Sequence, residues 1–132
     1  MTPAKVNLNI VSQRTAWIKE MIENLHDLPI ENREKFLSSK HTVAAAESYL
    51  RHALEALFDI GRHILARSFE APVTEYKEIA QNLLEREILN KEKADILRQM
   101  AGYRNRMVHF IYLPDLSWQK ITISEFPCLA KV

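Results

Sequence analysis

Residues 42–68 read TVAAAESYLRHALEALFDIGRHILARS, and this stretch decides the fold of the chain. Its apolar positions recur every three or four residues and form a stripe that consists of Leu50, Leu54, Leu57, Gly61 and Ile64. This spacing predicts one long amphipathic helix with Thr42 as its N-cap. Gly61 costs a helix about 1 kcal/mol relative to alanine. We therefore expect another helix, from the same chain or from a second copy, to approach the backbone closely at this residue.

The same periodicity predicts helical structure before this long helix. Residues 6–28 carry apolar side chains at helical spacing, and Pro29 ends the pattern. A short helical turn is expected at residues 33–37. The chain therefore enters the long helix from an antiparallel neighbour and a brief connection.

Helices are also expected after the long helix. Thr74 opens one that runs to about residue 87, and Asn90 caps the next through about residue 100. Gly102 is then expected to separate that helix from a last one, which carries residues 103–112. The sequence contains no internal repeat and no low-complexity segment.

The last twenty residues have a different pattern. Pro114 and Pro127 exclude one continuous helix, and residues 121–123 are β-branched and read as extended. We therefore divide the chain into a helical domain, residues 1–112, and an irregular or extended C-terminal tail, residues 113–132.

Charge and composition restrict the class of protein. Eighteen basic residues against 17 acidic ones give a net charge of +1, which excludes nucleic-acid binding by bulk attraction. The single cysteine, Cys128, excludes an intramolecular disulfide and fits a reducing compartment. The N-terminus lacks a signal-peptide pattern, and no apolar run approaches 18 residues. We expect a soluble cytoplasmic protein with no membrane association.

The segment YRNRMVHFIY, residues 103–112, carries the clearest chemistry. Arg104 offers a planar fork of N–H donors that suits a phosphate, and His109 can exchange a proton near neutral pH. Together they indicate chemistry on a phosphodiester. The two positions differ by roughly 140° on a regular helix. We therefore expect Arg104 at a helix start, where its long side chain can swing round, while Asn105, His109 and Tyr112 share one face.

Structural interpretations compete with each of these assignments. The Arg/His segment also fits a surface helix start with a capping asparagine and a half-buried histidine. Arg106 is either a phosphate contact or a solvated charge, with the second favoured. Glu55 and Asp59 are spaced as a helical carboxylate pair, but pairing with Arg51 and Arg62 is the favoured interpretation over a divalent-ion site. We expect no metal and no cofactor.

The chain resembles a known family at these residues. Residues 100–109 (MAGYRNRMVH) are similar to the signature of the HepT-like proteins of the HEPN superfamily, in which an arginine and a polar residue precede a histidine. Residues 45–51 (AAESYLR) and 55–64 (EALFDIGRHI) are similar to the long second helix of that family. The resemblance implies an all-α, antiparallel bundle of four to five helices that forms a homodimer.

The resemblance also implies an activity. HepT-like proteins are metal-independent endoribonucleases that act as toxins of type VII toxin–antitoxin pairs, with an MntA-type minimal nucleotidyltransferase as partner. Arg104 and His109 match the catalytic pair, and Asn105 matches the polar position. The tyrosine that the antitoxin adenylylates is expected two residues after the histidine. Ile111 stands there, so Tyr112 is the nearest candidate for modification.

Two classes of function follow from these observations. In the first, Arg104 binds the scissile phosphate of RNA and His109 transfers protons. One histidine cannot act as base and acid at once, so a dimer cleft must supply two. In the second, the chain is a non-catalytic helical adaptor or substrate-binding partner of a nucleotidyltransferase, or an inactive family remnant.

Overall fold

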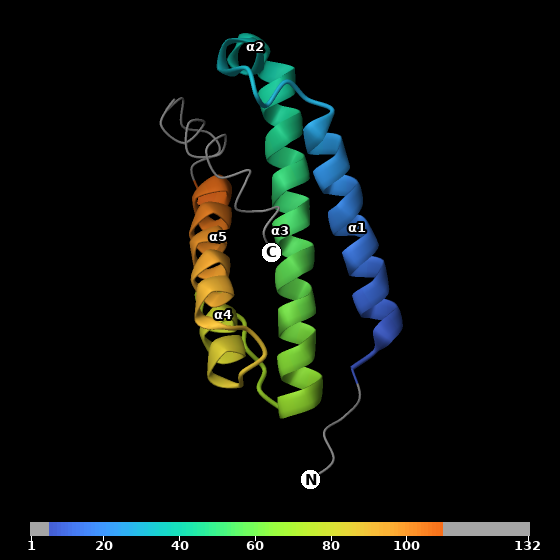
Figure 1. Cartoon of the computed structure of the whole chain (residues 1–132), viewed down its shortest axis with the longest axis vertical. Coiled ribbons are helices and arrows are strands. Elements are labelled where there is room, and N and C mark those ends of the chain that lie inside the picture. The colour runs from blue at the N-terminus through green and yellow to red at the C-terminus, as the bar shows by residue number, and fades with distance from the viewer. Residues whose placement is uncertain (1–5, 110–132) are drawn as a thin grey trace.

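The computed structural model describes residues 6–109, and the regular secondary structure in that range is entirely helical (Figure 1). The helices are α1 (Leu8–His26), α2 (Arg33–Ser38), α3 (Lys40–Phe69), α4 (Tyr76–Glu85) and α5 (Lys91–His109). The all-α class and the expected bundle of four to five helices are therefore confirmed for residues 6–109. The expected C-terminal tail and the domain boundary after residue 112 lie outside the described residues.

The long helix α3 forms the centre of an antiparallel bundle (Figure 1). α1 packs along one side of it, and α5 runs along the other side in the opposite direction to α3. α4 packs against both α5 and α3, and the short α2 covers the N-terminal end of α3. This arrangement places Arg104 of α5 beside the middle of α3, where Glu55 lies.

Polar side chains at the helix starts explain where three helices begin. Asn7, Asn32 and Asn90 each accept a backbone N–H from the first turn of α1, α2 and α5, at 3.0, 3.1 and 2.8 Å. Such caps satisfy N–H groups that have no partner within the helix. The predicted cap at Asn90 is therefore confirmed.

Two other predicted caps are wrong. α3 begins at Lys40, because the Ser39 side chain caps it by accepting the Thr42 N–H at 3.3 Å. Ser39 has the extended backbone that an N-cap requires, whereas Thr42 is already helical. α4 begins at Tyr76 after Glu75, whose side chain makes no capping bond, so Thr74 does not open it. Sequence patterns locate helices better than their ends.

The core is built around the predicted stripe of α3. Leu50, Leu54, Phe58 and Leu65 are almost completely buried. They pack with buried side chains of every other helix: Met21, Leu25, Phe36, Ile79, Ala80, Leu83, Leu97, Met100 and Ala101. Because α3 has helices on more than one side, its buried surface is wider than the predicted stripe. Two residues of that stripe, Leu57 and Ile64, are only partly buried.

Another helix approaches the backbone of α3 closely at Gly61, as its position in the stripe predicts. A Cβ atom added to Gly61 would lie 2.9 Å from Ile79 Cγ2 and 3.2 Å from Leu83 Cδ1, both on α4. The first distance is shorter than a van der Waals contact between carbons. The close neighbour is thus α4 of the same chain, which resolves the two possibilities left open by the sequence.

The predicted break at Gly102 is wrong. α5 continues from Lys91 to His109 through this glycine, so Arg104 lies in a helix interior and not at a helix start. A glycine costs a helix about 1 kcal/mol, which tertiary packing readily offsets. The buried Leu97, Met100 and Ala101 anchor this part of α5 to the core.

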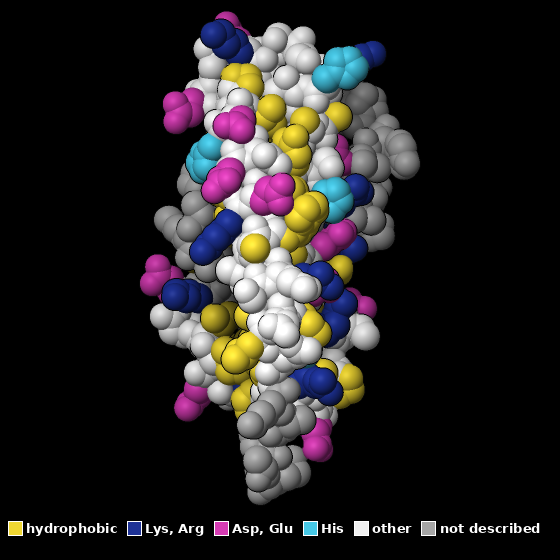
Figure 2. All heavy atoms as spheres, turned by 90° about the vertical axis from the view of Figure 1, so that its right-hand side faces the viewer, with side chains coloured by type: hydrophobic (Ala, Val, Ile, Leu, Met, Phe, Trp, Pro, Cys, Tyr) yellow, Lys and Arg dark blue, Asp and Glu magenta, His cyan; other side chains and the backbone are white. Residues whose placement is uncertain are grey.

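The α1 side of the bundle has a mixed surface. Acidic and basic side chains are interspersed there among apolar ones, without an extended area of one charge (Figure 2). Among the side chains that the structure describes, Leu8 and Trp17 of α1 are large apolar residues that lie exposed. Among the described residues, no helix has the length and apolar character needed to cross a membrane.

Candidate active site

The Arg104 guanidinium lies where α3, α4 and α5 meet. Its Nη2 atom is 3.6 Å from Oε1 of Glu55 on α3, and its Cζ atom is 4.2 Å from the ring centre of Tyr76 on α4. Nη1 donates a hydrogen bond to Oδ1 of Asn105 at 3.4 Å. The side chain is 20% exposed. Arg104 makes these contacts from within α5 and not from a helix start as expected.

Tyr76 is a fixed platform for this guanidinium. Its ring meets the completely buried ring of Phe58 edge-on, with 4.8 Å between centres and 75° between planes. A cation over an aromatic face at this distance is stabilised by about 0.5–2 kcal/mol. Arg62 of α3 lies 5.5 Å from the same ring centre, so two guanidinium groups flank one tyrosine. The sequence does not reveal Tyr76 as a partner of Arg104, because the two residues are 28 positions apart.

The oxygen contacts of Arg104 leave donors unused. Both are long, at 3.4 and 3.6 Å, and the Nε atom is buried without a hydrogen-bond partner among the described residues. A guanidinium has five N–H groups in a rigid fork. A partly exposed arginine held in place with terminal N–H groups to spare is suited to bind a phosphate oxygen pair.

The other predicted site residues occupy α5 after Arg104. Asn105 is half-buried and accepts from Arg104, so its oxygen orients the guanidinium. His109 is the last residue of α5, five positions beyond Arg104 in the same continuous helix. The side chains of Arg106 and His109 lie outside the described residues, as does Tyr112 altogether. Their assigned roles stay predictions.

Glu55 and Asp59 of α3 are held in ion pairs. Asp59 lies 3.5 Å from Arg62, the predicted partner, and 3.7 Å from Arg14. The predicted partner of Glu55 was Arg51, but Glu55 pairs with Arg104. The favoured interpretation of a salt-bridged face is thus confirmed, with one partner corrected. Within residues 6–109, no group of three or more His, Cys, Asp or Glu side chains is arranged to hold a metal ion. Exposed pairs of this kind stabilise a fold by less than about 1 kcal/mol.

Two histidines of α3 have structural contacts. Nε2 of His63 accepts the backbone N–H of Asn7 at 3.0 Å, next to the start of α1. His52 shares a 3.4 Å hydrogen bond with Ser48 and meets the Trp17 ring edge-on. Both histidines therefore connect α3 with α1, on the side of α3 away from α5.

Glu47 is a buried carboxyl group on the core face of α3. It is 9% exposed, and its Oε1 atom has no hydrogen-bond partner among the described residues. Burial raises the pKa of Glu47 above its ordinary value of 4.5, and the charge of Arg51 one turn away lowers it by less. Desolvation disfavours the charged form of a carboxyl group, so the ionised Glu47 is unfavourable in the folded state.

We expect the replacement Glu47→Gln to stabilise the protein at pH 7.5 by about 1 kcal/mol, because it removes a poorly compensated buried charge. A raised folded-state pKa contributes stability below pH 4.5 that is lost as pH rises through the folded value. The advantage of the variant should therefore shrink toward pH 4. Urea unfolding of both proteins at the two pH values measures this. Equal differences at both pH values, or a less stable variant at pH 7.5, would contradict it.

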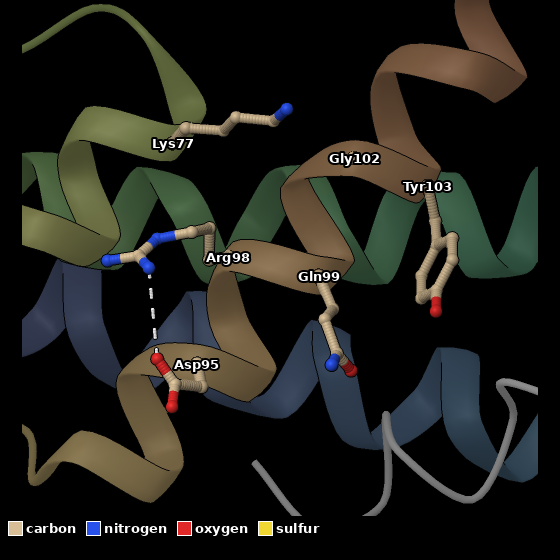
Figure 3. Close-up of a pocket in the computed structure, with 6 residues that line it drawn as sticks. All are labelled: Lys77, Asp95, Arg98, Gln99, Gly102 and Tyr103. Carbon is tan, nitrogen blue, oxygen red and sulfur yellow. Dashed lines mark ion pairs between the residues drawn. The ribbon is translucent and has the colours of Figure 1, made fainter.

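A pocket of about 440 Å³ opens between the first turn of α4 and the outer face of α5 (Figure 3). Its lining residues are Lys77, Asp95, Arg98, Gln99, Gly102 and Tyr103. Arg98 forms a 3.8 Å ion pair with Asp95 and donates a hydrogen bond to the Gln81 side chain. This pocket could not be predicted from the sequence, because Lys77 and Arg98 come from different helices.

The sequence matches the family model described as "Ribonuclease HepT-like" over residues 18–112, which is most of the chain. The chain belongs to the HepT-like family. This HepT-like match contains Arg104, Asn105 and His109 and confirms the family inferred from the motif. None of the curated proteins matches this HepT-like chain.

The HepT-like fold is also present in a solved structure. A chain from the crystal structure of a toxin–antitoxin with AMP-PNP superimposes on this HepT-like protein with a TM-score of 0.78 and 19% sequence identity. The alignment covers 92% of this chain and 93% of the other. The two chains therefore share a fold over nearly their whole lengths.

Proposed function

We propose that this HepT-like protein is a metal-independent endoribonuclease and the toxin of a type VII toxin–antitoxin pair, with an MntA-type minimal nucleotidyltransferase as antitoxin. Membership of the HepT-like ribonuclease family supports the activity. The fold shared with a chain of a toxin–antitoxin structure supports the toxin role. The observation that carries the proposal is the Arg104 guanidinium, held against Tyr76 and Glu55 with N–H groups left for a phosphate.

In this mechanism Arg104 binds the scissile phosphate and stabilises the charge that develops on its oxygens. His109 takes the proton from the ribose 2′-hydroxyl as the O2′–P bond forms. A second acid gives a proton to the leaving 5′-oxygen as the P–O5′ bond breaks. The products are a 2′,3′-cyclic phosphate and a 5′-hydroxyl. Asn105 orients Arg104, and Arg106 adds a contact to the RNA backbone.

The second acid comes from a second copy of the chain. Positions 104 and 109 of the continuous α5 are separated by about 7.5 Å along the helix axis and roughly 140° around it. One chain therefore supplies a single histidine on a different side of α5 from its arginine position. A two-fold homodimer brings two copies of the segment to one cleft, which provides both a base and an acid.

The partner nucleotidyltransferase controls this activity by modifying a tyrosine beyond α5. Tyr112 is the candidate, one position after the site where the family has its tyrosine and this chain has Ile111. The displaced tyrosine also supports the alternative function. In that alternative the protein is an adaptor or substrate-binding partner of the nucleotidyltransferase and has no nuclease activity. Growth arrest on expression favours the toxin. Stable co-purification with the nucleotidyltransferase and no toxicity favours the adaptor.

Cleavage in the absence of metal tests the proposed function directly. Purified protein with single-stranded RNA in EDTA should yield fragments that end in a 2′,3′-cyclic phosphate. The same oligonucleotide with 2′-O-methyl groups should stay intact, because its nucleophile is blocked. Gel electrophoresis and mass spectrometry of the ends measure both results. Intact RNA, or cleavage of both substrates, would overturn the proposal.

A further inference from the structure

We propose that the pocket between α4 and α5 binds the RNA strand beside the scissile phosphate, with Lys77 and Arg98 contacting its backbone. This inference rests on the proposed ribonuclease function and adds a substrate-binding site to it. The pocket has a volume of about 440 Å³ and lies next to the candidate active site without sharing its residues.

The pocket lies on the face of α5 that leads to His109. Positions 98, 102, 105 and 109 are spaced by four, three and four residues in one continuous helix, so they fall within about 60° around its axis. Gly102, in the lining of the pocket, is about 10.5 Å from position 109 along the axis. An RNA strand bound at His109 can therefore follow one side of α5 into the pocket.

Adjacent residues link the pocket to Arg104 on both helices. Lys77 lines the pocket, and the preceding Tyr76 carries the Arg104 guanidinium on its ring at 4.2 Å. Tyr103 lines the pocket, and the next residue is Arg104 itself. The pocket and the surroundings of the Arg104 guanidinium are thus formed in part by consecutive residues of the same two helices, α4 and α5.

The charges of the pocket suit a phosphate. Lys77 is exposed and forms no ion pair with the described residues, and Figure 3 shows its side chain extended beside α5. Arg98 shares its charge with Asp95, which leaves the pocket a net charge of +1 from two cations and one carboxylate. Gln99 adds amide donors, and Tyr103 adds a ring of the kind on which single-stranded bases stack.

The α1 side has both signs of charge interspersed, and the whole chain has a net charge of only +1 (Figure 2). Binding to RNA must then depend on local contacts rather than on the field of the protein. The pocket supplies such contacts beside the proposed site of cleavage, and its polar lining distinguishes it from an apolar protein-docking groove.

Binding of a 2′-O-methyl RNA that cannot be cleaved tests this inference on the full chain. Two variants distinguish the contribution of positive charge to binding from that of the open volume of the pocket. Lys77→Ala removes a cation, and Gly102→Leu fills the pocket without changing its charge. Lys19→Ala on α1 is the control, since it removes an exposed lysine from the far side of α3. Fluorescence anisotropy at several salt concentrations measures the dissociation constants, and circular dichroism checks folding.

We expect Lys77→Ala to weaken binding by roughly three- to tenfold at about 0.1 M salt and to lower the slope of log Kd against log salt by about 0.7. Gly102→Leu should weaken binding by a similar factor with folding intact, while Lys19→Ala changes it less than twofold. Unchanged affinity in the two pocket variants would overturn the inference. That result, with RNA cleavage by the wild type, would leave the proposed function standing; no cleavage by the wild type refutes the proposed function separately.

Discussion

Replacement of Arg104 by alanine is expected to lower the rate of RNA cleavage by about 10²–10³-fold, the effect of losing one preorganised donor to a developing oxyanion. Arg104→Lys keeps the charge but loses the planar fork, and should retain more activity than alanine but less than arginine. His109→Ala should lower the rate by about 10²–10⁴-fold through loss of proton transfer. Rates of cleavage of one RNA in EDTA measure all three.

A structural role of Arg104 must be separated from a chemical one. Glu55→Gln is the matched control, because it removes the 3.6 Å ion pair and keeps the guanidinium on Tyr76. If Arg104 acts on the phosphate, Glu55→Gln retains most of the activity. If Arg104 only joins α5 to α3, the two variants lose activity and stability alike. The double variant Arg104→Ala/His109→Ala should be little worse than the poorer single variant, since both residues serve one step.

The helices could be predicted from sequence because each follows a local rule. The stripe of α3 and the close approach at Gly61 both follow from apolar spacing in one segment. The predicted helix break at Gly102 was wrong because it rested on the low helix propensity of glycine alone, without the residues that pack against this part of α5. Leu97, Met100 and Ala101 bury the turn of α5 that precedes that glycine, and burial exceeds a cost of about 1 kcal/mol.

The candidate site was predictable only in part for a related reason. Arg104, Asn105 and His109 lie within six residues and form a motif that a sequence displays directly. The residues that contact Arg104 are not part of such a motif. Glu55 and Tyr76 come from other helices, and only the packing of α3, α4 and α5 brings them to the guanidinium. The geometry that orients a catalytic group is a tertiary property.

Substitution of Gly61 by leucine is expected to lower the free energy of unfolding by about 3 kcal/mol, a large share of the 5–15 kcal/mol typical of a domain. Even a Cβ atom at this position meets Ile79 Cγ2 at 2.9 Å. Ile79 is completely buried and that methyl group is attached to its branched Cβ, so it cannot rotate away freely. A leucine must therefore push α4 from α3.

The chain offers an internal control, because its only other glycine is also helical. Gly102→Leu should leave stability unchanged or raise it by up to about 1 kcal/mol, since a better helix former replaces glycine on the outer face of α5. Urea unfolding followed by circular dichroism compares the two. The effect of Gly61→Ala on the free energy of unfolding should change from a loss to a gain in an Ile79→Ala background. There the higher helix propensity of alanine is no longer opposed by the contact with Ile79. Equal stability of the Gly61 and Gly102 leucine variants would mean that α4 does not pack against α3 at this residue.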